Sequence, residues 1–202
     1  PAKLLRLIAK EGATFTHCVP TILQMLLAAP EVEDTDLSRL KMVIGGSALP
    51  RGLAAAAMQR GIDIYAGYGL SETCPVLSFA AVTPGEEEDV AARVRTGRPL
   101  PLVDLRVVDE EMAEQPRDGA STGEVVVRAP WLTAEYVKNP QATAALWRGG
   151  FMHTGDVGHI DEDGSLMITD RMKDVIKSGG EWVSSLELES LVSTVDGVAE
   201  VA

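Results

Sequence analysis

The sequence predicts an α/β protein in three parts: a partial parallel sheet with helices over residues 1–90, a β-rich, barrel-like subdomain over 91–170, and the start of a small α+β domain over 171–202. In the first part, strand-like apolar runs alternate with helical runs and glycine turns, which is typical of parallel sheets. Alternating apolar and polar residues replace that pattern in the second part. In the third part a strand, a glycine loop and a helix signal follow one another.

Helical and strand-like segments alternate in the first part. Leu4, Leu5, Ile8 and Ala9 are predicted to share one face of a helix. A proline can open the next helix, because the first helical N–H has no partner within the helix. The predicted elements are a helix ending at Gly12, a strand at 14–19, a helix at 21–29 between Pro20 and Pro30, a strand at 42–44, a helix between Pro50 and Gly61, and a strand at 62–65.

Strands dominate the second part. Leu105 and Val107 alternate with Asp104 and Arg106, as expected for a strand with one buried face. An Asp-Gly pair between two apolar runs is a signal for a hairpin. The predicted segments are a solvated acidic loop at 86–89, strands at 103–107 and 124–128, and a hairpin of 157–160 with 166–168 across Asp163-Gly164.

A strand, a glycine loop and a capped helix are predicted in the third part. Asp170 and Arg171 lead to a strand at 175–177. Ser184 and Glu187 have the spacing of a capping box, in which the two side chains satisfy free backbone N–H groups at the start of a helix. The helix is predicted to bury Leu188, Leu191, Val192 and Val195, and a new strand is expected at 198–201, so that this domain has only begun.

Composition and charge disfavour several classes of protein. The 202 residues include 18 Lys+Arg against 30 Asp+Glu, and a net charge of −12 disfavours a general nucleic-acid-binding surface, which needs a positive field. No apolar run approaches the roughly 18–20 residues of a membrane-spanning helix. Cys18 and Cys74 form neither a disulfide scaffold nor a paired metal motif, which favours a reducing, cytoplasmic location.

Four motifs occur in a fixed order along the chain. They are Gly67–Thr73, Thr154-Gly155-Asp156, Asp170–Asp174 and Gly179-Gly180-Glu181. In this order the chain resembles the adenylate-forming (AMP-binding) superfamily, which includes acyl-CoA synthetases, luciferases and peptide-synthetase adenylation domains. The segment 176–182, followed by two serines, is most similar to medium- or long-chain fatty-acyl-CoA ligases.

The first motif would carry much of the nucleotide chemistry. Activation of a carboxylate by ATP needs a donor at the phosphates, a carboxylate for Mg²⁺ and a platform for adenine. By the resemblance, Tyr68 stacks on adenine, Ser71 contacts phosphate and Glu72 holds Mg²⁺, the last two being catalytic. Gly67 and Gly69 complete this nucleotide-binding loop. Read alone, the motif is equally consistent with a tight turn beside a packed tyrosine.

Two strand ends upstream are implied in binding as well. The resemblance places the backbone of Gly46, Ser47 and Ala48 against adenine, and His17 and Gly45 at the carboxylate substrate. A lone histidine on a strand is also consistent with a packed, hydrogen-bonded residue. The turn at 45–48 by itself is an ordinary connection from a strand to a helix.

The second and third motifs supply contacts to the ribose. The resemblance implies that Asp156 accepts hydrogen bonds from the two ribose hydroxyls, since a carboxylate only accepts. Ile168 and Arg171 are included in the same nucleotide site, and Lys173 is implied to be the hinge of the small domain. The alternative is that the charged run at 170–174 forms a surface salt bridge.

By the resemblance, the last motif serves the second of two half-reactions, in which the acyl group passes from AMP to coenzyme A. The resemblance implies that Gly179, Gly180 and Glu181 line the channel for coenzyme A, and that Lys177 contributes to catalysis. Lys177 is also consistent with a solvent-exposed lysine, and Trp182 with a core residue.

The resemblance as a whole implies an ATP-dependent acyl-CoA synthetase with a carboxylate substrate, a fatty acid by preference, and with ATP/AMP, Mg²⁺ and coenzyme A as cofactors. Alternatives are an adenylation domain that loads a carrier protein, an aryl-CoA ligase, and a non-catalytic nucleotide-binding module. The family's phosphate loop and its C-terminal lysine do not occur in these residues, so the piece is expected to be inactive alone. A homodimer is left open.

Overall fold

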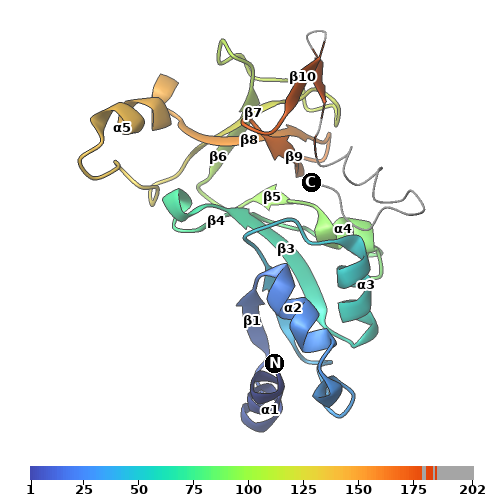
Figure 1. Ribbon diagram of the computed structural model, residues 1–202. Coiled ribbons are helices and arrows are strands. Elements are labelled where there is room, and N and C mark those ends of the chain that lie inside the picture. The colour runs from blue at the N-terminus through green and yellow to red at the C-terminus, as the bar shows by residue number, and fades with distance from the viewer. Residues whose placement is uncertain (179–180, 184, 186–202) are drawn as a thin grey trace. The chain divides into compact units, whose positions relative to one another are not determined.

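A computed structural model describes residues 1–178, 181–183 and 185. The chain divides into two compact units, Pro1–Leu100 and Pro101–Ala202, each with a sheet of its own (Figure 1). The division into parts at 90 and 170 stays a prediction. The expected capping box and the helix and strand after it lie outside the described residues, apart from Ser185.

The first unit contains a five-stranded sheet in the order β1-β2-β3-β4-β5. The first three strands are parallel, as predicted, with Cys18 opposite Ile44 and Ile44 opposite Ala66. Their carboxyl ends therefore lie at one edge of the sheet, while the last two strands join antiparallel. The strands are β1 (Phe15–Cys18), β2 (Lys41–Ile44), β3 (Asp63–Gly69), β4 (Val76–Phe79) and β5 (Arg98–Pro99).

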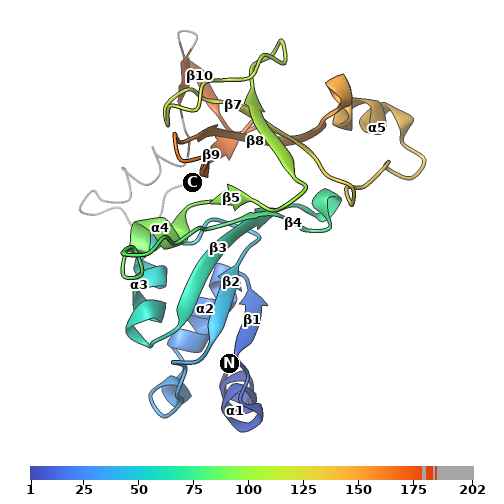
Figure 2. The ribbon, with the colours of Figure 1, turned by 180° about the vertical axis from the view of Figure 1, so that it is seen from behind.

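Helices pack against this sheet, and α2 and α3 lie on the same face of it (Figures 1 and 2). A left-handed Gly12, with φ of 62°, ends the first helix, and Pro20 lies in the first turn of the second. Of the four residues expected on one face of the first helix, Leu5 and Ile8 are buried, whereas Leu4 and Ala9 are exposed. The helices are α1 (Ala2–Glu11), α2 (Pro20–Leu27), α3 (Arg51–Gln59) and α4 (Val90–Val94), with short 3₁₀ turns η1 (Pro30–Val32) and η2 (Ser71–Thr73).

Strand β3 continues into the glycine-rich motif, which the sequence analysis places in a loop. Gly67 pairs with Phe79 and Tyr68 with Ser78 of β4, and the register shifts before Gly69. The sequence analysis missed this extension of β3 because it depends on pairing with β4, a strand of only four residues later in the chain. The motif is therefore held by backbone pairing up to Gly69, and only the residues after it turn away.

The guanidinium of Arg93 joins β3 to the acidic tract. Its Nη1 donates to Asp63 Oδ1 at 2.7 Å and to Ile64 O at 3.0 Å, and its Nε and Nη2 donate to Glu87 O at 2.9 and 2.8 Å. The Arg93 side chain is 9% exposed. Asp89 also caps α4 by accepting from Ala91 N. The tract at 86–89 is a loop with Glu87, Glu88 and Asp89 exposed, as expected, and its backbone is held by Arg93.

Arg93→Ala is expected to lower the free energy of unfolding by about 3 kcal/mol, because it leaves one carboxylate and two carbonyl oxygens without a buried donor. The measurement is urea unfolding of the 202-residue chain followed by circular dichroism. Arg60→Ala is the control, because Arg60 pairs with Glu33 on the surface and its loss should change little. An equal decrease of the unfolding free energy in the two variants would contradict a stabilising role for the buried contacts of Arg93.

The same contact makes the stability depend on pH. Burial raises the pKa of Asp63, but hydrogen bonds from Lys41, Arg93 and Tyr65 outweigh burial and hold the pKa below its ordinary value. A lowered pKa stabilises the fold above the unfolded-state pKa, and that stabilisation is lost as the pH falls through the folded-state pKa. The difference in unfolding free energy between wild type and Arg93→Ala should therefore shrink below about pH 4.

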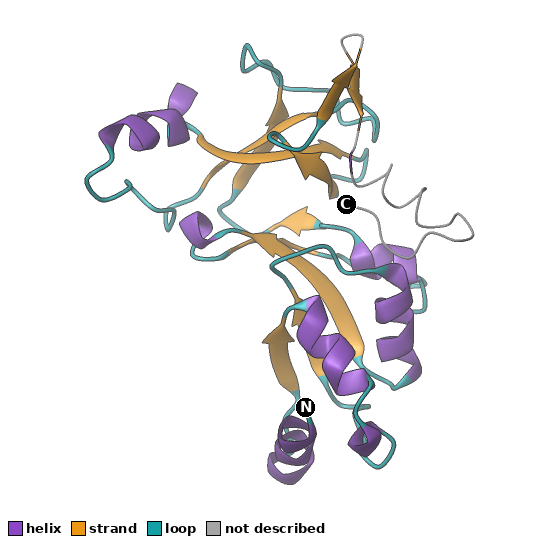
Figure 3. Cartoon of the chain, in the orientation of Figure 1, coloured by secondary structure: helices purple, strands orange, loops and turns teal. Residues whose placement is uncertain are grey.

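The second unit is β-rich, as the sequence predicts, and its strands form an antiparallel sheet in the order β6-β7-β8-β9 (Figure 3). Leu105 and Val107 are buried, whereas the alternating Asp104 and Arg106 are partly exposed. The elements are β6 (Asp104–Val108), β7 (Gly123–Arg128), α5 (Pro140–Leu146), the 3₁₀ turn η3 (Arg148–Gly150), β8 (Met152–Ile160), β9 (Leu166–Arg171), β10 (Ile176–Ser178) and β11 (Glu181–Val183).

Two expectations about this unit are corrected. Strand β8 begins at Met152 and contains Asp156, whereas the sequence analysis expects this strand to begin only at 157. Glu181 lies in strand β11 and pairs with Ser178, so it is not part of a loop, while Gly179 and Gly180 lie outside the described residues. In both cases pairing between strands extends a segment that local signals leave as a loop.

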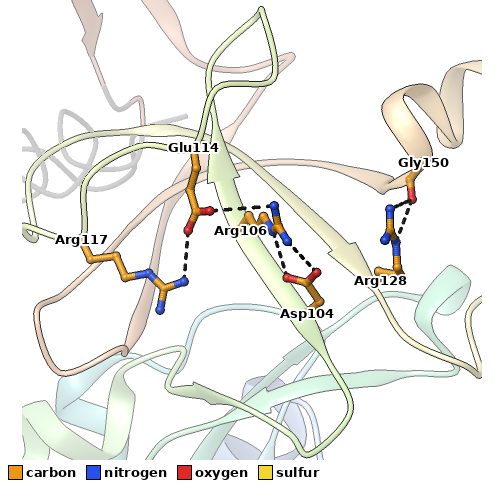
Figure 4. A network of polar contacts seen from close by, with 6 residues as sticks. All are labelled: Asp104, Arg106, Glu114, Arg117, Arg128 and Gly150. Atoms are coloured by element: carbon orange, nitrogen blue, oxygen red, sulfur yellow. Dashed lines mark hydrogen bonds and ion pairs between the residues drawn. The ribbon is translucent and has the colours of Figure 1, made fainter.

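Phe151 lies between two guanidinium groups on this sheet. The Cζ atoms of Arg106 and Arg128 are 4.7 and 4.2 Å from its ring centroid. Figure 4 shows their polar partners: Arg106 pairs with Asp104 and Glu114, and Arg128 donates to Gly150 O. Because the charged partners are partly exposed to water, these ion pairs contribute little stability.

Candidate functional site

His17, Gly45 and Gly67 lie together at the carboxyl ends of the three parallel strands. A Cβ atom placed on Gly45 would be 3.3 Å from His17 Nε2 and 3.4 Å from Gly67 O. His17 is exposed, so it is not a core histidine. Ligands of parallel α/β sheets bind at this edge, and the residues predicted to meet the substrate carboxylate are therefore neighbours at an accessible position.

The turn after β2 is open to solvent. Gly46 has φ of 85°, and a Cβ there would be 3.2 Å from Val19 Cγ1, which explains the glycine. Gly46, Ser47 and Ala48 are all exposed, between buried Gly45 and Leu49. The backbone of this turn is thus accessible to a ligand, as its predicted role requires.

A tight turn presents Ser71 and Glu72. A Cβ on Gly69 would come within 1.6 Å of Pro75 O, so no other residue fits this backbone. Beyond it, η2 leaves Ser71 exposed and Glu72 half-buried, and Tyr68 before it is half-buried. The geometry allows all three side chains to reach a ligand, although their individual roles remain predictions.

Thr73 holds this turn and was missed by the sequence analysis. Its side chain is fully buried, and its Oγ1 accepts from Leu70 N at 2.8 Å and lies 2.9 Å from Leu70 O. The signal was available, because a threonine hydroxyl can bond backward to the main chain three residues earlier, here at Leu70.

Thr73→Val is expected to destabilise the turn by about 1–3 kcal/mol, because valine has the same shape but leaves Leu70 N–H without its acceptor. Hydrogen exchange at Leu70 should become faster in the valine variant. Thr73→Ser keeps the hydroxyl and should exchange like the wild type. Unchanged protection in Thr73→Val would contradict this role.

In the second unit, a bulge in β8 carries Asp156. His153 pairs with Val126 and Val157 pairs with Glu124, so that Thr154, Gly155 and Asp156 stand opposite Val125 alone. Gly155 has φ of 71°. Thr154 Oγ1 donates to Val125 O at 2.7 Å and accepts from Asp156 N at 3.1 Å. Bulges of this kind re-aim side chains and recur near active sites.

Asp156 and Arg171 are direct neighbours across β8 and β9. They occupy opposite positions in the ladder, and Arg171 Nε is 3.1 Å from Asp156 Oδ1. The Asp156 side chain is only 5% exposed, whereas that of Arg171 is 57% exposed. The half-buried Ile168 lies on the same strand, opposite Gly158. A salt bridge is therefore present, but its acidic member is buried.

Lys173 lies in an exposed turn after β9. Asp174 N and Val175 N donate to Arg171 O at 2.9 and 2.8 Å, and Lys173 Nζ is 3.7 Å from Asp174 Oδ2. The buried Asp170, another residue that the sequence analysis left without a role, accepts from Arg171 N and from Ser185 N. Asp170 thus bonds to the chain on both sides of the turn.

The remaining predicted residues are placed only in part. Lys177 lies in β10, opposite Trp182. Among the described residues, no group of three or more His, Cys, Asp and Glu could hold a metal ion, and no helix is long and apolar enough to cross a membrane. That residues of both units serve one nucleotide site, as the resemblance implies, stays a prediction.

Comparison with known proteins adds an independent finding. A sequence profile described as AMP-binding enzyme matches residues 1–137. The chain is 45% identical to the long-chain-fatty-acid–CoA ligase of Thermus thermophilus, covering 100% of the chain and 39% of that protein. Among solved structures, the amide bond synthetase McbA from Marinactinospora thermotolerans matches with a TM-score of 0.83 and 32% identity, over 99% of this chain and 40% of that one. A fatty acyl CoA synthetase of Mycobacterium tuberculosis matches with a TM-score of 0.76 and 33% identity, over 100% and 39%. The chain thus spans about two fifths of the length of these relatives.

Proposed function

The chain belongs to the family of AMP-binding enzymes, and from this premise we propose that the whole protein is an ATP-dependent acyl-CoA ligase with a fatty acid as substrate. In the first half-reaction, a carboxylate oxygen attacks the α-phosphorus of ATP, giving acyl-AMP and releasing pyrophosphate. In the second, the thiol of coenzyme A takes the acyl group and AMP leaves. The fatty acid is favoured by the names of two relatives, a long-chain-fatty-acid–CoA ligase and a fatty acyl CoA synthetase.

The observation that carries the proposal is the buried carboxylate of Asp156 beside Arg171. A carboxylate accepts several hydrogen bonds, so Asp156 can keep the contact with Arg171 and also accept from the two hydroxyls of a ribose. Burial strengthens such bonds, because little water competes for them. Arg171, which is largely exposed, is assigned to the ribose or the phosphates, and Ile168 to the same nucleotide site.

The first unit supplies the other contacts to ATP and the acid. Tyr68 is assigned to adenine, Ser71 to phosphate and Glu72 to Mg²⁺. The metal would neutralise charge on the phosphates, and a single protein carboxylate suits it, since Mg²⁺ is usually held by one or two carboxylates together with phosphates and water. The exposed turn at 46–48 and the pair His17 and Gly45 are assigned to adenine and the acyl pocket.

The chain beyond β9 is assigned to the second half-reaction. Lys173 is the proposed hinge, and Lys177 with the segment 179–181 is assigned to the approach of coenzyme A. A cytoplasmic location remains a prediction, as does the oligomeric state.

A second candidate acceptor is an amine. The similarity to an amide bond synthetase over nearly the whole chain favours it, since both enzymes would begin from a carboxylate and ATP. An aryl-CoA ligase and an adenylation domain that loads a carrier protein differ from the main proposal in the acid or the acceptor alone.

The test uses the whole protein with ATP and Mg²⁺ and a series of acids from hexanoate to palmitate, with benzoate as the aromatic case. We expect pyrophosphate exchange that depends on the fatty acid, acyl-AMP in the mass spectrum, and acyl-CoA after addition of coenzyme A. Glu72→Ala should lose the exchange. Formation of amide or carrier-bound product in place of acyl-CoA would change the acceptor, and absence of exchange with every acid would leave a nucleotide-binding module. The 202-residue chain alone should not turn over.

A further inference from the structure

Glu124, at the start of β7, contacts β8 through both of its carboxylate oxygens, one at the bulge that carries Asp156 and one at His153 just before it. Gly155 N donates to Glu124 Oε1 at 3.2 Å, and His153 Nδ1 is 2.8 Å from Glu124 Oε2. Both side chains are almost buried, with 12% of Glu124 and 10% of His153 exposed. We infer that Glu124 and His153 are positioning residues that set the place of Asp156 and thereby the affinity for the ribose of ATP. The inference rests on the proposed function, which assigns Asp156 to the ribose.

The backbone of the bulge needs a hydrogen-bond acceptor from a side chain. Because Thr154, Gly155 and Asp156 stand opposite one residue of β7, the N–H of Gly155 has no backbone acceptor on β7 in the regular ladder. Glu124 supplies the acceptor from its side chain. On the other side, Gly155 O accepts from Met172 N at 2.8 Å. The peptide groups of Gly155 are thus held by β7 on one side and by the turn after β9 on the other, one residue before Asp156.

His153 fixes the carboxylate in turn. A carboxylate only accepts, so Nδ1 is the donor to Glu124, and Nε2 lies 3.0 Å from Arg148 O in η3. The ring lies between η3 and Glu124, and its bond to Glu124 Oε2 limits the rotamers that Glu124 can adopt. Through Glu124, His153 can therefore act on the position of Asp156.

A purely structural brace and a positioning role predict different results. If Glu124 only stabilised the fold, its loss would weaken binding of every nucleotide equally. If it aims Asp156 at the ribose, its loss should weaken only those nucleotides that carry ribose hydroxyls.

The experiment measures dissociation constants by titration calorimetry for the whole protein, without carboxylate, using ATP and 2′,3′-dideoxy-ATP as probes. Glu124→Ala should bind ATP about 10-fold more weakly, the effect of losing roughly one hydrogen bond to a charged group, with dideoxy-ATP nearly unchanged. Glu124→Gln should rescue binding, because an amide can accept from Gly155 N and donate to the other tautomer of His153. Glu114→Ala is the matched control: this carboxylate lies in the exposed network of Figure 4, and its loss should affect neither probe.

Equal weakening of ATP and dideoxy-ATP in Glu124→Ala, or no weakening, would overturn the inference. If Glu124→Ala does not fold, His153→Ala answers the question, since it leaves the bond from Gly155 in place and should show a smaller loss with the same preference for ATP. Asp156→Ala separates the two levels of the argument. If Asp156→Ala weakens the binding of ATP but not of dideoxy-ATP, while Glu124→Ala weakens both equally or neither, the positioning role of Glu124 fails and Asp156 stays assigned to the ribose. If Asp156→Ala does not distinguish the two nucleotides, the ribose assignment fails and the inference about Glu124 fails with it.

Discussion

Replacing Asp156 with alanine in the whole protein is expected to weaken ATP binding by about 10- to 150-fold, which corresponds to the roughly 1.5–3 kcal/mol of a hydrogen bond to a charged partner. The effect should be large because the carboxylate is buried and the bulge of β8 holds its backbone. Alanine removes both acceptor oxygens, and Arg171 is left without its ion-pair partner.

The measurement is calorimetric titration with ATP, combined with thermal unfolding to separate binding from stability. Asp156→Asn tests the contribution of the negative charge. The amide keeps one acceptor oxygen, but it is neutral and its NH2 group cannot accept a hydrogen bond from Arg171 or from a ribose hydroxyl. Glu162→Ala is the control, since Glu162 is an exposed acid in the turn between β8 and β9. Unchanged ATP affinity in Asp156→Ala would remove Asp156 from the ribose, and Asp156 and Arg171 would then be a structural ion pair.

The sequence predicts this site well where its signals are local. The alternation of apolar residues in β6 and the Asp-Gly turn between β8 and β9 fix those strands with short-range rules. The parallel order of β1, β2 and β3 then brings His17, Gly45 and Gly67 to one edge, because parallel strands end on the same side. The hairpin of β8 and β9 brings Asp156 opposite Arg171 in the same way.

The parts that were missed depend on pairing between distant residues. Nothing within Thr154-Gly155-Asp156 shows that it is a bulge, because the bulge exists only relative to β7. The requirement for glycine at position 69 also depends on a later segment, because a Cβ atom there would collide with the carbonyl oxygen of Pro75. The contacts of Glu124 and Asp170 join segments 29 and 15 residues apart, which no local pattern encodes.

Replacing Lys173 with proline tests the proposed hinge. Proline fixes φ and removes one backbone donor. The turn is held by the backbone donors of Asp174 and Val175, which the substitution leaves in place. If the small domain turns about Lys173 between the two half-reactions, as the hinge proposal requires, carboxylate-dependent pyrophosphate exchange should change little, because it precedes the rotation. Thioester formation from preformed acyl-adenylate and coenzyme A should fall by at least about 100-fold, since the proposed rotation would be blocked.

Lys173→Ala is the control that separates the backbone from the side chain. The lysine side chain is 73% exposed and its nearest acid is 3.7 Å away, so its removal should leave both half-reactions nearly intact. Loss of both half-reactions in Lys173→Pro alone would mean that proline damages the turn that carries Arg171, and the hinge assignment would fail. Loss of thioester formation in Lys173→Ala as well would move the role from the backbone to the ammonium group, because alanine keeps the rotation free.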